Sequence, residues 1–227
     1  MQTKRYVLFD WDNTIRNGYT LDSWVYYLCR RFVLPSDLWD SLKQIKKAYE
    51  KKSITHDQYA EIACSQYMLA LKDVRYDELR CFALEYLPYD REYLFYNIVS
   101  LFNKIYENDI DIIIVSGAPS IILELYKDDF HIKRIFALDG EVIDGAFSGK
   151  VKCNYGFDKQ SVVHKIIDQY GNFPFMAFGD STSDIPMLEH ALYAFSINNI
   201  MDQENYKCLE SKNILAGVIE CCPELLQ

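Results

Sequence analysis

Three short polar motifs in this chain each follow an apolar segment: DWDNT at residues 10–14, SGAP at 116–119 and GDSTSD at 179–184. Asp10, Asp12, Asp180 and Asp184 supply four carboxylates, which would repel one another if they met at one edge of a sheet. A hard cation with oxygen ligands would neutralise them, and Mg²⁺ is the expected ion. The carboxylates therefore indicate a magnesium site.

The same edge offers groups that bind an anion. Lys159 is expected to open a helix between the second and third motifs, and a helix is expected to begin after Ser116. Backbone N–H groups at Ser116 and Gly117 would then face a bound ligand, and phosphate is the anion that suits both these groups and Mg²⁺. The residues thus point to phosphate chemistry at strand ends.

The elements that must position these motifs alternate between strand and helix after residue 90. Short apolar runs predict buried strands, and longer segments with helical periodicity predict helices between them. This order indicates an α/β protein with a Rossmann-like parallel sheet, whose ligands bind at the carboxyl ends of the strands. The expected strands are Tyr6–Asp10, Ile110–Ser116, Arg134–Ala137, Phe173–Gly179 and Ala191–Ile197, with a hairpin over Glu141–Val151. The expected helices here are Arg91–Tyr106, Pro119–Tyr126, Asp158–Gln169 and Ser183–His190.

Residues between the first strand and residue 90 have a different pattern. Four segments with helical periodicity follow one another without a convincing strand: Asp22–Phe32, Ser36–Lys52, His56–Lys72 and Tyr76–Tyr86. Thr55 with Gln58 resembles a capping box at the start of the third. We expect a small all-helical cap domain over residues 16–89, inserted into a catalytic core of residues 1–15 and 90–227. The cap's aromatic residues, such as Trp24, are expected to form its interior.

Composition excludes several classes of protein. Half of the 227 residues are hydrophobic, and the formal net charge is −9, so a disordered or low-complexity chain is excluded. The charge argues against nucleic acid or an anionic membrane as partner, and no apolar run is long enough to span a bilayer. The seven cysteines show no ligand-like spacing, which favours a reducing, cytoplasmic location. The four histidines are equally dispersed, so neither a zinc site nor a Ser-His-Asp triad is indicated.

The motifs together resemble the haloacid dehalogenase (HAD) superfamily, in the order of its four motifs. DWDNT is similar to the family's DxDxT motif, Ser116 with Gly117 to its second, Lys159 to its lone lysine, and GDSTSD to its GDxxxD motif. The resemblance covers the whole chain. It is greatest to the phosphoserine-phosphatase-like branch, with a helical cap inserted after the first motif.

The resemblance implies a role for each residue in a two-step phosphoryl transfer. Asp10 would be the nucleophile that becomes an aspartyl phosphate, and Asp12 the general acid and then the base. The implied magnesium ligands are Asp10, the backbone carbonyl of Asp12, and Asp180. The remaining implied residues are Ser116, Gly117 and Lys159 on the phosphoryl oxygens, Thr14 orienting the first loop, and Asp184 in support.

The chain departs from phosphoserine phosphatases where they recognise their substrate. Tyr19 or Thr20 stands near the position of an acidic residue, and no arginine motif of the SLRxR kind occurs in the cap. Phosphoserine is therefore a doubtful substrate. Arg16, Asp22, Lys51, Lys52 and Arg75 remain open as other substrate contacts. Asn13 stands where glycine is commoner, and asparagine tolerates the left-handed backbone of a tight turn.

These observations predict a magnesium-dependent phosphatase that acts on a small soluble phosphorylated metabolite, as a monomer or homodimer. A phosphotransferase or phosphomutase with the same first step is the nearest alternative, and a non-catalytic phosphate-binding regulatory protein is a further one. A dehalogenase is disfavoured, because carbon–halogen displacement needs neither Asp12 nor a magnesium cluster. Each motif taken alone has an ordinary structural explanation, such as a helix cap or a solvated turn. Their joint occurrence at strand ends favours the enzyme.

Overall fold

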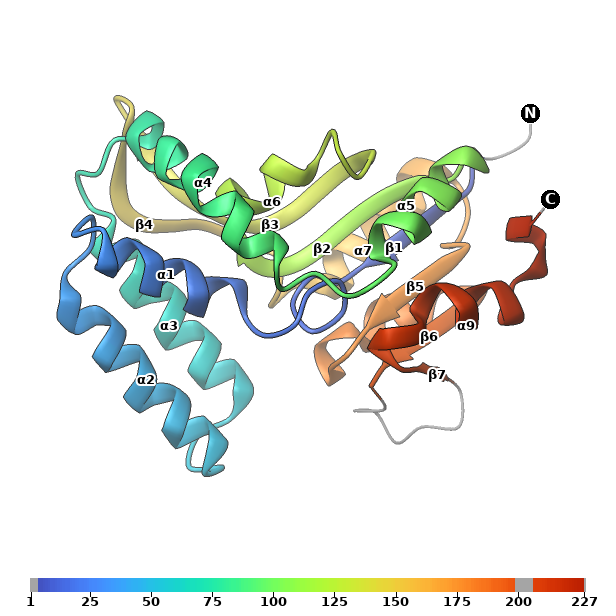
Figure 1. Ribbon diagram of the computed structural model, residues 1–227, viewed down its shortest axis with the longest axis horizontal. Coiled ribbons are helices and arrows are strands. Elements are labelled where there is room, and N and C mark those ends of the chain that lie inside the picture. The colour runs from blue at the N-terminus through green and yellow to red at the C-terminus, as the bar shows by residue number, and fades with distance from the viewer. Residues whose placement is uncertain (1–3, 199–205, 227) are drawn as a thin grey trace. The chain divides into compact units, whose positions relative to one another are not determined.

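The computed structural model describes residues 4–198 and 206–226 (Figure 1). The chain forms two compact units. The first comprises Met1–Gly18, Tyr93–Ala137 and Tyr155–Gln227, and the second comprises Tyr19–Glu92 and Leu138–Asn154. In the described part of the chain, no helix has the length and apolarity needed to cross a membrane.

A mostly parallel sheet organises the first unit, and the expected α/β class is confirmed. The strand order is β4-β3-β2-β1-β5-β6-β7. The central strand β1 (Tyr6–Phe9) pairs in parallel with β2 (Asp111–Pro119) on one side and with β5 (Met176–Gly179) on the other. β5 pairs with β6 (Tyr193–Ile197), and β6 with β7 (Lys207–Leu209), both in parallel. The chain therefore reverses its direction of winding at β1, the position where open α/β sheets bind ligands.

Helices cover both faces of this sheet. On one face, Tyr6 and Leu8 pack in a buried cluster with residues of α7 (Lys159–Tyr170) and α8 (Ile185–Leu188). On the other face, Phe9 meets Phe102 of α5 (Ile98–Glu107), with ring centroids 4.9 Å apart. Since β1 is covered on both sides, all four of its residues are buried apolar side chains. This accounts for an unbroken apolar run where a half-exposed strand would alternate.

The connection between residues 91 and 98 differs from the expected helix Arg91–Tyr106. The preceding helix α4 (Tyr76–Arg91) continues through Pro88, and α5 begins only after Asn97, whose φ of 67° is left-handed. The intervening segment instead pairs with the loop after β1: the N–H of Phe95 donates to the carbonyl oxygen of Ile15 over 2.9 Å. This tertiary pairing replaces the helical hydrogen bonds that periodicity suggested.

The C-terminal part of the first unit contains elements that the sequence analysis did not identify. These are β7 and α9 (Ile214–Cys221). The helix expected over Pro119–Tyr126 is a short α6 (Ser120–Leu123) followed by a 3-10 turn at Glu124–Tyr126. A second 3-10 turn, Thr182–Asp184, precedes α8.

The second unit contains four helices and a hairpin. The helices are α1 (Thr20–Arg30), α2 (Ser36–Glu50), α3 (His56–Ala70) and α4. The capping box at Thr55 and Gln58 is present, with the N–H of Gln58 donating to Thr55 Oγ1 over 3.2 Å. Trp24 lies fully buried, as expected, and its indole N–H donates to the hydroxyl of Tyr67 over 2.9 Å.

The hairpin of the second unit is longer than the sequence suggested. β3 (Ile132–Ile143) begins in the first unit and continues into the second, where it pairs antiparallel with β4 (Ala146–Asn154). Asp144 and Gly145 form the tight turn, with φ of 51° and 81°. Gly140 lies close to Phe147 and Met68, since a Cβ there would be 2.8 Å and 2.9 Å from their atoms. The hairpin thus packs with the helices, although the sequence boundaries assigned it to the core.

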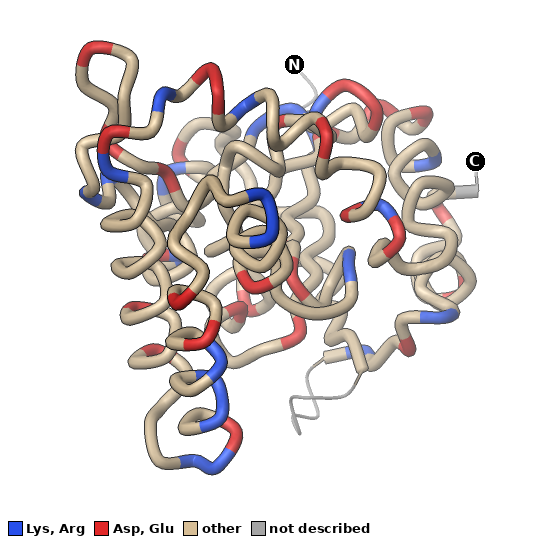
Figure 2. Tube along the Cα trace, turned by 60° about the vertical axis from the view of Figure 1, so that its left-hand side comes forward, with Lys and Arg blue, Asp and Glu red and all other residues tan. Residues whose placement is uncertain are grey.

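Charged residues are distributed without a long basic stretch. Acidic and basic residues are interspersed along the trace in Figure 2, and no described helix is basic over its whole length. This agrees with the acidic balance of the sequence, in which 33 acidic residues exceed 24 basic ones. Local groups must therefore provide the positive charge at any phosphate site.

Candidate functional site

The loop after β1 holds Asp10 at the carboxyl edge of the sheet. The N–H of Asp10 donates to the carbonyl oxygen of Phe178 in β5 over 3.0 Å, which extends the strand pairing by one residue. Trp11 is fully buried, with its ring 4.9 Å from that of Tyr126. Asn13 has a φ of 58°, which confirms the left-handed turn expected there. The buried indole thus anchors a tight turn between two carboxylates.

The end of β5 supplies two further carboxylates. Asp180 follows the strand directly, and Thr14 donates a hydrogen bond from Oγ1 to Asp180 Oδ1 over 3.3 Å, which connects the first and third motifs. Asp184 is completely buried, and its Oδ2 accepts hydrogen bonds from the backbone N–H groups of Asp180 and Ser181 at 3.0 and 2.9 Å. Asp184 therefore fixes the shape of the turn that carries Asp180.

Gly179 permits this close packing and was not singled out by the sequence analysis as a site residue. A Cβ at Gly179 would lie 2.3 Å from the Cβ of Asp184, far inside van der Waals contact. Only glycine allows Asp184 to lie against the end of the strand in this way. The glycine of the motif was visible in the sequence, but the close approach that explains it is a tertiary contact.

Lys159 is the first residue of α7, and its side chain reaches the carboxylates. Its Nζ donates to Asp10 Oδ1 over 2.8 Å and to Asp184 Oδ1 over 2.5 Å, and the residue is only 4% exposed. Burial alone would lower the pKa of the lysine, but the carboxylates of Asp10 and Asp184 outweigh it and raise that pKa above its ordinary value. Lys159 therefore stays charged.

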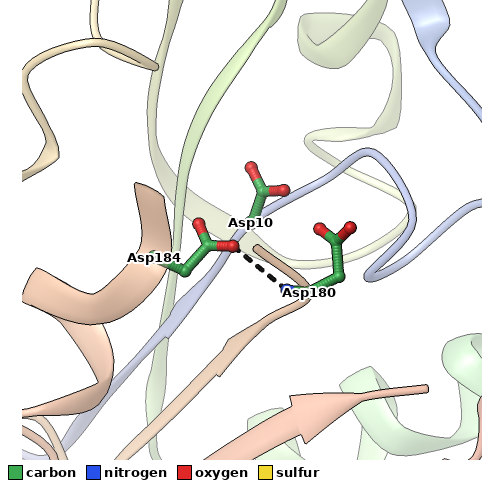
Figure 3. A group of neighbouring side chains, drawn as sticks. All are labelled: Asp10, Asp180 and Asp184. Carbon is green, nitrogen blue, oxygen red and sulfur yellow. Dashed lines mark hydrogen bonds between the residues drawn. The ribbon is translucent and has the colours of Figure 1, made fainter. Parts of the chain in front are cut away.

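Asp10, Asp180 and Asp184 form a compact group of buried carboxylates (Figure 3). One oxygen atom from each of the three lies within 4.8 Å of the others. Burial, and then the charges of Asp10 and Asp184, raise the pKa of Asp180 to about 9. Burial likewise raises the pKa of Asp10, although Lys159 opposes the shift. Three buried carboxylates facing one ammonium group favour an additional cation, and an all-oxygen donor set suits Mg²⁺.

Asp12 lies outside that group, although it is two residues from Asp10. Its Oδ1 lies 3.8 Å from Nη1 of Arg16, a residue that is only 1% exposed. The sequence analysis considered Arg16 only as a possible substrate contact. The structure places it beside Asp12, the residue that was expected to act as the acid.

Ser116 and Gly117 lie near the end of β2. Phe9 is the register partner of Ile114, so Ser116 lies at the same carboxyl edge of the sheet as the loop that follows β1. Ser116 is buried, and its Oγ accepts a hydrogen bond from the N–H of Ala118 over 3.2 Å. The helix expected after Ser116, over Pro119–Tyr126, begins one residue later than expected, because β2 continues to Pro119 and α6 begins at Ser120.

The other open substrate candidates lie in the second unit. Asp22 is buried there, accepting a hydrogen bond from the hydroxyl of Tyr59 over 2.7 Å and pairing with Lys46 at 2.5 Å. Lys51 and Lys52 are exposed at the end of α2, and Arg75 forms a backbone bridge to Ala146 of the hairpin. Asp22 therefore has a structural explanation within its own unit.

Comparison with known proteins gives a family and a set of similar folds. A family model of haloacid dehalogenase-like hydrolases matches residues 7–189. A phosphoserine phosphatase, solved as a phospho-aspartyl intermediate analogue, is 20% identical with a TM-score of 0.69 over 97% of this chain and 99% of that one. A protein of unknown function from Bordetella pertussis Tohama I is 19% identical, with a TM-score of 0.76 over 92% of this chain and 100% of that one.

A more distant structure is similar over almost the whole chain as well. A cytosolic 5'-nucleotidase IIIB bound to cytidine is 12% identical, with a TM-score of 0.69 over 99% of this chain and 87% of that one. No curated protein sequence matches this chain. At these identities the solved structures establish a shared fold, and the match to the family model rests on the sequence itself.

Proposed function

The chain belongs to the haloacid dehalogenase-like hydrolase family, and on that premise we propose that it is a magnesium-dependent phosphatase of small phosphomonoesters. The observation that carries the proposal is the meeting of Asp10 and Asp180, which follow the adjacent strands β1 and β5, with Lys159 of α7 and Asp184. A nucleophilic carboxylate, a buried ammonium and a set of oxygen donors for a cation are the groups that phosphoryl transfer needs.

In the first step, an oxygen of Asp10 attacks the phosphorus atom of the substrate. A bond forms between that oxygen and phosphorus, the bond from phosphorus to the ester oxygen breaks, and Asp12 gives its proton to the departing oxygen. The hydrogen bond from Lys159 holds the Asp10 carboxyl group in one orientation before the attack. Asp10 then carries the phosphoryl group.

In the second step, water attacks phosphorus and gives its proton to Asp12. The bond between phosphorus and Asp10 breaks, inorganic phosphate leaves, and both aspartates return to their starting states. We assign Lys159, Ser116 and Gly117 to bind the phosphoryl oxygens, whose negative charge needs fixed donors in the transition state. Asp184 keeps the turn of Asp180 in shape through its backbone hydrogen bonds.

The proposed magnesium site uses Asp10, Asp180 and the backbone carbonyl of Asp12. When bound, Mg²⁺ would offset the charge of the carboxylates and polarise the phosphoryl group. The raised pKa of Asp180, to about 9, supports this assignment, because the free protein lacks enough positive charge to keep all three buried carboxylates ionised. Asp184 is proposed as a supporting residue.

The proposed substrate is a small soluble phosphorylated metabolite other than phosphoserine. Tyr19 stands near the position where phosphoserine phosphatases carry an acidic residue for the substrate's ammonium group. Asp22, the nearest acidic residue along the chain, is engaged by Lys46 and Tyr59. The helical cap expected over residues 16–89 would select among substrates. We place the enzyme in the cytoplasm, as a monomer or homodimer, which agrees with seven described cysteines that form no disulfide.

The test is phosphate release from a panel of sugar phosphates, nucleotides, phosphoamino acids and small phosphomonoesters, with Mg²⁺ or with EDTA. Magnesium-dependent release that Asp10→Asn abolishes is the expected result. Asp109→Asn is the matched control, because it makes the same change at a largely exposed side chain that pairs with Lys4. Release that persists in Asp10→Asn would refute the proposal, and transfer of phosphate only to an added alcohol would indicate a phosphotransferase.

A further inference from the structure

We propose that Arg16 is a positioning residue for Asp12, holding the carboxyl group of this acid where it can reach the ester oxygen of the substrate. The proposal rests on the proposed phosphatase function, because Asp12 acts as an acid only in that reaction. It assigns a task to a buried arginine that the family motifs do not include.

The position of Asp12 requires an explanation. Asp10, Asp180 and Asp184 gather around one point and share Lys159 or a turn, and Asp12 is not a member of this group of three. The Asp12 side chain is 14% exposed, and its Oδ1 lies 3.8 Å from Nη1 of Arg16. Arg16 therefore provides a positively charged group beside the Asp12 side chain. A position outside the group of three suits a residue that faces the leaving group.

Arg16 is itself held firmly. Its Nη1 donates a hydrogen bond to the carbonyl oxygen of Gly18 over 3.0 Å, and its guanidinium carbon lies 4.6 Å from the centre of the Tyr93 ring. A planar guanidinium fixed by an aromatic face and a carbonyl loses little further freedom when it contacts a carboxylate. The buried side chain is therefore a preorganised support.

The backbone around Arg16 is fixed as well. The N–H of Arg16 donates to the carbonyl oxygen of Trp11 over 3.2 Å, and the N–H of Asn17 donates to that of Tyr93 over 2.8 Å. Arg16 also forms backbone bridges with Asp12 and Leu94. The first loop and the segment after α4 are thus joined at this residue. A purely structural role, in which Arg16 only joins these segments, is the competing explanation.

The two explanations predict different effects of an Arg16 substitution on the reaction rate with good and with poor leaving groups. A misplaced acid slows the departure of a poor leaving group much more than that of a good one, because a good leaving group departs without a proton. Phenol is a far weaker acid than p-nitrophenol, so phenyl phosphate requires Asp12 more than p-nitrophenyl phosphate does. The value of kcat/KM reports the steps up to aspartyl-phosphate formation, so the shared hydrolysis step does not mask the difference.

The experiment measures kcat/KM for both esters with saturating Mg²⁺ in wild type, Arg16→Gln and Arg16→Lys. Since general acid catalysis contributes about 100- to 10,000-fold, Arg16→Gln is expected to lower the value for phenyl phosphate by about 10- to 100-fold and that for p-nitrophenyl phosphate by less than about 3-fold. Arg16→Lys keeps the charge but not the planar fork, so an intermediate change of about 3-fold in the ratio is expected. In an Asp12→Asn background, neither substitution should change the ratio further.

Arg5→Gln is the matched control. Arg5 also lies over an aromatic ring, 4.9 Å from the centre of Phe175, and donates to a backbone carbonyl, that of Asn108, over 3.4 Å. This variant is expected to lose stability without a change in the ratio of the two esters. Thermal unfolding shows which variants are folded. If Arg16→Gln does not fold, the ratio of the two kcat/KM values in folded Arg16→Lys tests the proposal.

Two results would overturn the proposal. One is an unchanged ratio of the two kcat/KM values in a folded Arg16 variant, and the other is an equal change in the presence and absence of Asp12. Failure of the proposed function appears separately, in wild-type protein that releases no phosphate or in Asp10→Asn protein that still does. Wild-type activity together with an unchanged ratio would refute the role of Arg16 alone.

Discussion

Gly179 and Asp184 approach each other so closely that a Cβ on the glycine would lie 2.3 Å from the Cβ of the aspartate. This contact places Asp184 beneath the turn after β5, where its Oδ2 accepts hydrogen bonds from the N–H groups of Asp180 and Ser181. Its Oδ1 accepts from Lys159. Because Gly179 has no Cβ, Asp184 can contact both the turn that carries Asp180 and the side chain of Lys159.

Replacement of Gly179 by alanine should displace Asp184 and with it Asp180. Overpacking of this kind costs about 1–3 kcal/mol of unfolding free energy, and we expect the magnesium-dependent activity to fall by at least about 10-fold. Gly171→Ala is the control: it strains a left-handed residue with φ of 69°, at the end of α7, where no atom lies within 4 Å of the added carbon. Both variants should unfold earlier, but only Gly179→Ala should lose activity per folded molecule. Equal activities would contradict this account.

Asp12→Asn should separate the two steps of the reaction. Without a group that accepts the proton of water, the aspartyl phosphate should accumulate when p-nitrophenyl phosphate is the substrate, because this ester needs no acid to leave. Rapid-quench measurement should show a burst of about one p-nitrophenol per active site, followed by slow turnover. If Asp12→Asn turned over at the wild-type steady-state rate without a burst, this would argue against Asp12 as the base.

Lys159→Met should destabilise the protein in the absence of metal. Removal of one partner of a buried ion pair typically costs about 3–5 kcal/mol of unfolding free energy, because Asp10 and Asp184 would be left without their ammonium partner. Phosphatase activity should fall by at least about 100-fold, since a donor to the phosphoryl group is lost. Denaturant unfolding in EDTA measures the stability loss. Lys212→Met, at an exposed pair with Glu210, should change neither property.

Mg²⁺ should stabilise the protein more at higher pH. The pKa of Asp180 is raised from 3.8 to about 9 in the folded, metal-free protein. A carboxyl whose pKa is higher folded than unfolded contributes stability that is complete below its unfolded pKa and is lost as the pH rises through its folded value. The metal-free protein should therefore lose stability through Asp180 between about pH 4 and pH 9.

Differential scanning fluorimetry with Mg²⁺ or EDTA at several pH values tests this coupling. An ion present at about 100 times its Kd adds about 2.7 kcal/mol to the free energy of unfolding. The resulting shift in Tm should be larger at pH 8 than at pH 6, because protons compete with the ion for the carboxylates. Asp180→Asn should remove most of the difference between the two pH values. A shift in Tm that is independent of pH in wild type would show that Asp180 does not exchange a proton for the metal.

The sequence alone determined the class of fold, the family, and the places where chemistry was to be expected. Apolar runs that end in aspartate, such as Tyr6–Asp10, indicate buried strands, because only a strand covered on both faces lacks polar alternation. The turn at Asn13 and the capping box of Thr55 were likewise readable, since each depends on residues within a few positions. Features that depend only on neighbouring residues can therefore be predicted from the local sequence.

Tertiary structure decided the features that depend on residues far apart in the chain. The segment after α4 is not helical, because the N–H of Phe95 donates to the carbonyl oxygen of Ile15. The hydrophobic periodicity near residue 95 does not predict this hydrogen bond. Arg16 and Asp12 are only four residues apart, but the Tyr93 ring that packs against the guanidinium of Arg16 comes from a distant segment of the chain. The raised pKa of Asp180 likewise arises from burial among carboxylates that separate segments of the chain supply, so it depends on the assembled sheet and not on the motif by itself.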